Sequence, residues 1–161
     1  MVVVGALVPS VALGEGQKTT TVITSKRMTA SNETNQAIFQ DNVKMVRGEL
    51  IVHSDIMIVH FKDKASSPSS PSGQPSPTKS KKEIRFIEAK GRVKIQNGEN
   101  RATCQHAVYY TQEEKVILKG SPVAWQGGTR ISGPKMTMFL KENRSIVEGG
   151  TQVIIEESEE N

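Results

Sequence analysis

Apolar residues recur along the chain in short runs bounded by Gly, Asn or Ser, which is the pattern of β-strands. We expect three strands in the run VILKGSPVAWQGGTRISG at residues 116–133. A Gly turn separates the first strand from the second, and a Gly-Gly turn separates the second from the start of the third. Other strands are predicted at residues 19–30, 37–39, 43–46, 50–61, 84–89, 93–96, 102–110, 130–140, 146–148 and 153–155. No helical period of useful length is present, so the predicted class is all-β.

The strands repeat with a fixed period. Val43, Val93, Val123 and Val153 each follow a predicted turn, written Asp41-Asn42, Gly91, Gly120 or Gly149-Gly150, and their spacings are 50, 30 and 30. A Ser/Pro/Lys tract at residues 62–82 is 21 residues long, and without it the first spacing becomes 29. The segments 37–39 and 43–46 are expected to form a hairpin around Asp41-Asn42.

A second column of small residues has the same period. Ser25, Ser54, Cys104 and Gly133 are spaced by 29, 50 and 29 residues. Apolar residues follow each of them three and five positions later: Met28 and Ala30, Met57 and Val59, Ala107 and Tyr109, Met136 and Met138. A period of this length is typical of stacked architectures, in which no single repeat buries its own apolar face.

Composition limits the domain count and the charged surface. A chain of 161 residues is about one domain, expected at residues 19–155, and its 4% aromatic content is low for a large core. The tract 62–82 holds five Lys against one Asp, so the rest of the chain balances 16 basic with 16 acidic residues. The net charge of +4 therefore belongs to the tract, which is expected to be a disordered insertion loop. A nucleic-acid partner is not expected.

The two ends differ in character. Residues 1–14 are apolar and uncharged, too short to span a bilayer as a helix, which needs about 20 residues. They resemble the apolar region of a secretory signal peptide with a cleavage site at Ala12-Leu13-Gly14, although the basic start of such a signal is missing. A truncated signal peptide is favoured over an ordinary buried strand. Residues 156–161 form an acidic tail.

No residue cluster predicts catalysis. Cys104, the only cysteine, has His106 two positions away on the same predicted strand face, but no third member of a catalytic set accompanies them. His53, His60 and His106 lack the spacing of a zinc site. We therefore expect no enzyme activity, no metal and no cofactor.

Six phrases of the sequence are similar to the LptA/OstA family of periplasmic lipopolysaccharide transport proteins. They are ITSKRM at 23–28, AIFQDNV at 37–43, GRVKI at 91–95, LKGSPV at 118–123, GGTRISG at 127–133 and VEGG at 147–150. The resemblance runs from about residue 23 to 155. The sequence departs from the family pattern in the insertion at 62–82 and in Asp41, where Gly is usual.

This resemblance implies an elongated, half-open β-jellyroll of two facing antiparallel sheets with open edges near residues 22–28 and 153–155. It also implies a head-to-tail periplasmic bridge that carries lipopolysaccharide between an LptC-like inner-membrane protein and an LptD-like outer-membrane protein. Two alternatives stay open: a module of one of these partners, or a structural β-repeat whose core is filled by its own side chains.

The acyl chains of lipid A are expected to lie in an apolar groove between the sheets. The residues expected to line it are Met28, Val43, Met57, Val59, Val93, Ala107, Tyr109, Val123, Trp125, Met136, Met138 and Val153. Met suits such a groove because its flexible thioether adapts to irregular shapes. Each of these residues could equally be part of an ordinary core.

Overall fold

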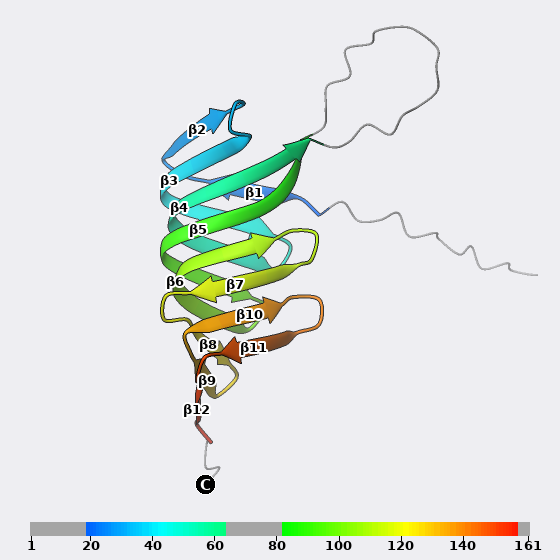
Figure 1. Cartoon of the computed structure of the whole chain (residues 1–161). Helices are drawn as coiled ribbons and strands as arrows, with labels where there is room; N and C mark the ends of the chain where they lie inside the picture. Colours follow the sequence, from blue (N-terminus) through cyan, green and yellow to red (C-terminus); the bar gives the residue numbers. More distant parts are fainter. Residues whose placement is uncertain (1–18, 64–81, 158–161) are drawn as a thin grey trace, which may run out of the picture.

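The computed structural model describes residues 19–63 and 82–157, and every regular element in these ranges is a strand (Figure 1). The strands are β1 (Thr21–Thr24), β2 (Arg27–Ser31), β3 (Gln36–Arg47), β4 (Leu50–Asp63), β5 (Lys82–Asn97), β6 (Asn100–Tyr110), β7 (Lys115–Lys119), β8 (Val123–Gln126), β9 (Thr129–Ser132), β10 (Lys135–Phe139), β11 (Arg144–Glu148) and β12 (Gln152–Ile155). The all-β prediction is confirmed. Residues 1–14, most of the 62–82 tract and the end of the acidic tail lie outside the described residues.

All strands belong to one antiparallel sheet that folds back on itself into two layers. Layer A consists of β2, the first part of β3, the second part of β4, the first part of β5, the second part of β6, and then β7, β10 and β11. Layer B consists of β1, the remaining parts of the four long strands, and then β8, β9 and β12. The predicted half-open jellyroll is therefore present, with its two layers continuous through the long strands.

The chain passes from one layer to the other at corners built from consecutive residues with positive φ. The pairs are Asp41-Asn42 (65° and 51°), Gly91-Arg92 (76° and 44°), Gly120-Ser121 (74° and 53°) and Gly149-Gly150 (88° and 103°). In β3 and β5 the pairing register shifts at these residues, as at a β-bulge, and the strand bends without ending. The first column of the repeat thus marks corners.

The second column marks the matching corners of the intervening strands. The amide of Lys26 donates to the Asp41 carbonyl at 3.0 Å, and that of Gln105 donates to the Gly120 carbonyl at 3.1 Å. A Cβ atom on Gly133 would lie 2.8 Å from the Gly150 carbonyl oxygen. Successive corners are therefore stacked tightly, which explains the small residues of this column.

Four strand predictions were wrong for the same reason. Asp41-Asn42 is a corner inside the single strand β3, so segments 37–39 and 43–46 do not form a hairpin. Gly91-Arg92 is a corner inside the single strand β5, so segments 84–89 and 93–96 are not separate strands. The predicted strands 19–30 and 130–140 are each broken by a corner, the first between β1 and β2 and the second between β9 and β10. The ends of the 62–82 tract are also strand, since Lys62 pairs with Glu83 and Asp63 pairs with Lys82.

The hairpin turns of both layers lie on the side opposite the corners. Each long strand bends near its middle, so its two ends, with their turns, come to face each other across the open side of the stack (Figure 1). We call this line of facing turns the seam. The stack is long, with β1 and β2 at one end and β11 and β12 at the other (Figure 1).

Candidate functional site

The inner face of layer A carries an apolar ladder that crosses the stack from one edge strand to the other. Each member is the cross-strand partner of the next, and the order is Met28, Phe39, Met57, Ala89, Ala107, Leu118, Met136 and Val147. A parallel ladder beside it runs Ala30, Ala37, Val59, Ile87, Tyr109, Val116, Met138 and Ser145. The predicted residues three and five positions after each small residue lie on these two ladders. They come from every second strand.

Layer B presents a facing ladder of the same length. Its order is Ile23, Met45, Val52, Ile95, Ala102, Ala124, Ile131 and Val153. The middle of each ladder is closed from solvent, and Met57, Leu118 and Met136 are 0% exposed. An uninterrupted apolar interior therefore connects the two ends of the stack.

The structure places most of the predicted lining residues in this interior. Eight of them are buried: Val43, Met57, Val59, Val93, Ala107, Tyr109, Met136 and Met138. Met28 and Val153 end their ladders on edge strands and are 59% and 52% exposed. That acyl chains contact any of these residues stays a prediction.

Val123 and Trp125 depart from the expected arrangement. Val43 and Val93 are the first residues after their corners, and their side chains are buried. After the corner at Gly120-Ser121 this first position is taken by the nearly fully buried Pro122, so Val123 is the second residue after its corner. Ala124 is buried between them, and both Val123 and Trp125 lie on the outer face of layer B, opposite Thr103 and Arg101.

Sequence reasoning missed half of the layer A ladder and nearly all of the layer B ladder. Phe39, Ala89, Leu118 and Val147 each precede a corner by two residues, and Met45 and Ile95 follow Val43 and Val93 by two. Strict alternation on both sides of each corner would have identified them. This alternation was not followed across the corners because the sequence pattern predicts hairpin turns there.

Few polar contacts join the layers at the seam. Nδ2 of Asn100, in the β5–β6 hairpin of layer B, donates to Oδ1 of Asn143, in the β10–β11 turn of layer A, at 3.2 Å. The Arg47 guanidinium of layer B lies 6.0 Å from the ring centre of Tyr109 in layer A. Burial raises the pKa of Tyr109, and the charge of Arg47 opposes this rise.

A cavity of about 310 Å³ spans the seam beside Arg47 and Tyr109 and also contacts Leu50 and Leu140.

The two ends of the stack are open. Among the described strands, β1 and β2 pair only with β3, β11 pairs only with β10, and β12 pairs only with β9. Within residues 19–63 and 82–157, the large apolar residues that are exposed all lie on these four strands: Val22, Met28, Ile146, Val153, Ile154 and Ile155. The predicted edges near residues 22–28 and 153–155 are therefore confirmed, and β11 is a further edge.

Cys104 and His106 have different surroundings in the structure, since Cys104 is buried and the His106 side chain is partly exposed. Burial raises the pKa of the Cys104 thiol to about 11, so this cysteine is not a thiolate nucleophile at neutral pH. The His106 ring lies instead on the outer face of layer A, where Nε2 is 3.1 Å from Oε1 of Glu88. In residues 19–63 and 82–157, no group of three His, Cys, Asp or Glu side chains is arranged to bind a metal ion. These same ranges contain no helix long and apolar enough to cross a membrane.

A two-layered antiparallel stack, open at both ends and with a mainly apolar interior, defines a half-open β-jellyroll. The chain belongs to the LptA/(LptD N-terminal domain) LPS transport protein family, whose model matches residues 22–144. The family is one of transport proteins, and the resemblance read from the sequence is confirmed.

A solved structure shows the same fold. It is the crystal structure of LptH from Pseudomonas aeruginosa, described as the LptA-homologous periplasmic component of the conserved lipopolysaccharide transport device. The match has a TM-score of 0.69 at 10% sequence identity and covers 86% of this chain and 96% of that one. Among curated proteins, none matches the sequence of this chain.

Proposed function

We propose that the chain binds lipopolysaccharide with its acyl chains between the two layers and carries it across the periplasm, from the inner towards the outer membrane. The observation that carries this proposal is the pair of facing apolar ladders, which run without a polar interruption from the edge strands β1 and β2 to β11 and β12. A track of this kind gives an acyl chain apolar surroundings over the whole length of the stack. Burial of apolar surface contributes roughly 25 cal/mol per Å².

Acyl chains enter, in this proposal, by parting the layers at the seam. Interior residues such as Met57 and Met136 are 0% exposed, so the layers must separate before a lipid reaches them. The corners hold the opposite side together through a continuous backbone, whereas the seam is crossed by polar contacts such as the one between Asn100 and Asn143. Exposed polar contacts of this kind stabilise little, so the seam is the side that opens.

Site-specific photo-crosslinking tests the lipid path. A diazirine side chain of about the size of Met is placed at Met57 or Met136, and the protein is recovered from the periplasm after irradiation in cells. A lipopolysaccharide adduct is expected at both positions. The matched controls are Ile58 and Thr137, which are adjacent in sequence but lie on the outer face of layer A. Adducts at the controls and none at the Met positions would refute an interior path.

We propose further that the open ends bind LptC-like and LptD-like proteins and other copies of this chain. Strand directions alternate along both layers, so β11 of one copy lies antiparallel to β2 of the next, and β12 to β1, when copies stack head to tail. The facing strands match in length, with five residues in β2 and β11 and four in β1 and β12. Unpaired edge strands with exposed apolar side chains favour such strand addition.

A mixing experiment tests this assembly. Val22→Asp alters the β1 edge and Ile154→Asp alters the β12 edge, and each variant keeps the opposite end intact. In analytical ultracentrifugation, the unaltered chain is expected to form oligomers, each variant alone to stay monomeric, and the mixture to form dimers. Thr137→Asp, on the outer face of layer A, is the control and should not change assembly. Oligomers of either variant alone would refute pairing through these edges.

The buried interior also supports the alternative of a structural β-repeat that fills its own core. Met57, Leu118 and Met136 contact other side chains and not solvent. Ligand binding to the folded state raises the melting temperature. Purified lipid A is therefore expected to raise the melting temperature of a carrier and to leave that of a self-filled repeat unchanged. The family also includes LptD N-terminal domains, so a role as a module of the outer-membrane partner remains a candidate.

A further inference from the structure

The outer face of layer B carries basic residues that lack carboxylate partners. Lys94 and Arg101 are exposed, and within the described part of the chain neither makes an ion pair. On the outer face of layer A, by contrast, Lys90 pairs with Glu88 at 3.3 Å and Lys135 pairs with Glu148 at 2.7 Å. The positive charge on layer B is therefore available to a ligand.

These residues converge on a pocket. Arg101 is the cross-strand partner of Trp125 on β8, and Lys94 is the cross-strand partner of Thr103 on β6 and of His53 on β4. Together with Gln96 they line a cavity of about 400 Å³. This volume is in the range of small-molecule sites. None of the described residues that line it carries a carboxylate.

A second hollow extends the pocket towards the corners. It has a volume of about 590 Å³ and shares His53 and Lys94 with the first. Lys44, Arg92 and Asp55 lie on its wall, and the Arg92 guanidinium neutralises the Asp55 carboxylate by pairing with it at 2.6 Å. The surface is therefore a trough over layer B, with Trp125 at one end and Lys44 towards the other.

We propose that this trough binds an acidic saccharide, meaning a sugar ring that carries a phosphate or carboxylate group. The indole of Trp125 offers a flat apolar surface on which the C–H face of a sugar ring packs. Lys94 and Arg101 supply charge-assisted hydrogen bonds to the acidic substituent, and Arg in particular matches the geometry of phosphate and carboxylate. Gln96 and Thr103 supply donors and acceptors for hydroxyl groups.

Two features favour a saccharide over single-stranded nucleic acid. Trp125 is the only aromatic ring in the pocket apart from the His53 imidazole, whereas nucleic-acid grooves stack successive bases on several aromatic rings. Outside the 62–82 tract the chain is also neutral, with 16 basic and 16 acidic residues. Saccharide binding in the trough is independent of lipid uptake, because the trough lies on the outer face of layer B and the apolar ladders lie on the inner faces of the two layers.

Trp125 provides the readout, since the chain contains one tryptophan. Its fluorescence is titrated with glucose 6-phosphate, glucose and inorganic phosphate at constant ionic strength. Glucose 6-phosphate is expected to give a saturable change at concentrations about tenfold below those needed for glucose or phosphate. No saturable change would overturn the proposal. An equal response to phosphate alone would reduce the site to an adventitious anion site and would also overturn it.

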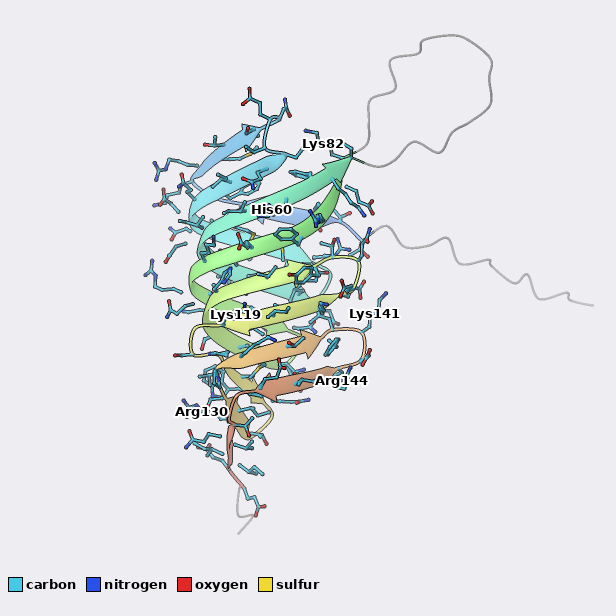
Figure 2. The ribbon with its side chains drawn as sticks, in the orientation of Figure 1. His60, Lys82, Lys119, Arg130, Lys141 and Arg144 are labelled. Atoms are coloured by element: carbon cyan, nitrogen blue, oxygen red, sulfur yellow. The ribbon has the colours of Figure 1, made fainter. Side chains whose placement is uncertain are left out.

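Variants locate the binding. Lys94→Gln and Arg101→Gln are each expected to raise the dissociation constant about tenfold, because each removes a charged hydrogen-bond donor. Both residues are exposed, so circular dichroism should show an unchanged fold. Lys119→Gln is the control, since Lys119 lies at the end of β7 in layer A (Figure 2) and should bind as before. Unchanged binding by the double variant would overturn the assignment.

Two further arms separate the remaining possibilities. Trp125→Leu, followed by the amide NMR shifts of Gln96 and Thr103, is expected to lose the response to glucose 6-phosphate. A retained response would show that the indole takes no part and would overturn a stacked sugar ring. A single-stranded oligonucleotide that binds more tightly than glucose 6-phosphate, and is lost in the Lys94→Gln variant, would replace the saccharide with nucleic acid. Failure of lipid uptake through the interior would leave all these results unchanged.

Discussion

The side-chain Nδ2 of Asn100 donates a hydrogen bond of 3.2 Å to Oδ1 of Asn143, and this bond joins layer B to layer A across the seam. The two residues lie 43 positions apart in the chain. The backbone joins the layers only at the corners, so contacts of this kind decide whether the seam side of the stack is closed or open.

Fixing this contact should block lipid entry. Asn100→Cys and Asn143→Cys are combined with Cys104→Ala, which removes the native thiol, and the pair is joined by a short bismaleimide. Fluorescence polarisation of labelled lipid A is expected to show uptake in the unlinked protein and none after linkage. Each single-Cys variant, blocked with N-ethylmaleimide, is the control. Undiminished uptake by the linked protein would show that acyl chains enter from the ends of the stack.

The corner at Gly91 should be more sensitive to substitution than an ordinary turn. Gly91 has a φ of +76°, and a Cβ atom there would lie 2.6 Å from Oδ2 of Asp55, the carboxylate that pairs with Arg92. Gly48 has a φ of +58° with nothing within 4 Å of its Cβ position. Gly48→Ala is expected to lower the free energy of unfolding by about 1–2 kcal/mol. Gly91→Ala should lower it by at least about 1 kcal/mol more. Urea denaturation measures both, and equal losses would contradict stacked corners.

Glu88 should make folding dependent on pH in acid. It lies on the outer face of layer A among Lys90, His106 and the largely buried His60, which is labelled in Figure 2. Partial burial would raise the pKa of Glu88, but hydrogen bonds and charges from Lys90 and His106 outweigh it and hold this pKa below its ordinary value of 4.5.

A lowered pKa in the folded state means that ionised Glu88 stabilises the fold at pH values above 4.5, and that this contribution is lost as the pH falls through the folded-state pKa. Glu88→Gln should therefore be less stable than the unaltered chain near neutral pH, and the difference should shrink in acid. Urea denaturation over a pH series from about 7 to about 3 measures this. Glu33→Gln, in an exposed turn, is the control. A difference that stays constant with pH would contradict the coupling.

Cys104 should react with alkylating reagents only when the layers separate or the chain unfolds. Cys104 is 4% exposed, so an alkylating reagent hardly reaches its sulfur in the folded state. Burial also raises the pKa of the thiol to about 11, so little reactive thiolate is present. Mass spectrometry after iodoacetamide treatment is expected to show slow labelling in native buffer and fast labelling in urea. If lipid A wedges the layers apart near β6, labelling in native buffer should also rise with lipid. Labelling of the lipid-free protein at the rate of a free thiol would contradict a closed interior.

Much of the interior was accessible from sequence because alternation and period are local properties. Met57 and Val59, Ala107 and Tyr109, and Met136 and Met138 fell on the two ladders of layer A, since each pair follows a small corner residue by a fixed number of positions. Val123 and Trp125 lie outside the interior, because Pro122 takes the first position after its corner and shifts the inward and outward alternation by one residue. A repeat aligned on its valines does not reveal this shift.

The sequence by itself determined that the protein is a stack of β repeats with an apolar side. A fixed period and alternating apolar positions are both patterns of the residue order alone. The tertiary structure alone decided that Asp41-Asn42 and Gly91-Arg92 bend strands and do not reverse them. Two residues with positive φ are compatible with either outcome, and hydrogen bonds to neighbouring strands select between them. The same long-range pairing placed Asn100 against Asn143 and gathered Lys94, Arg101 and Trp125 on one outer face.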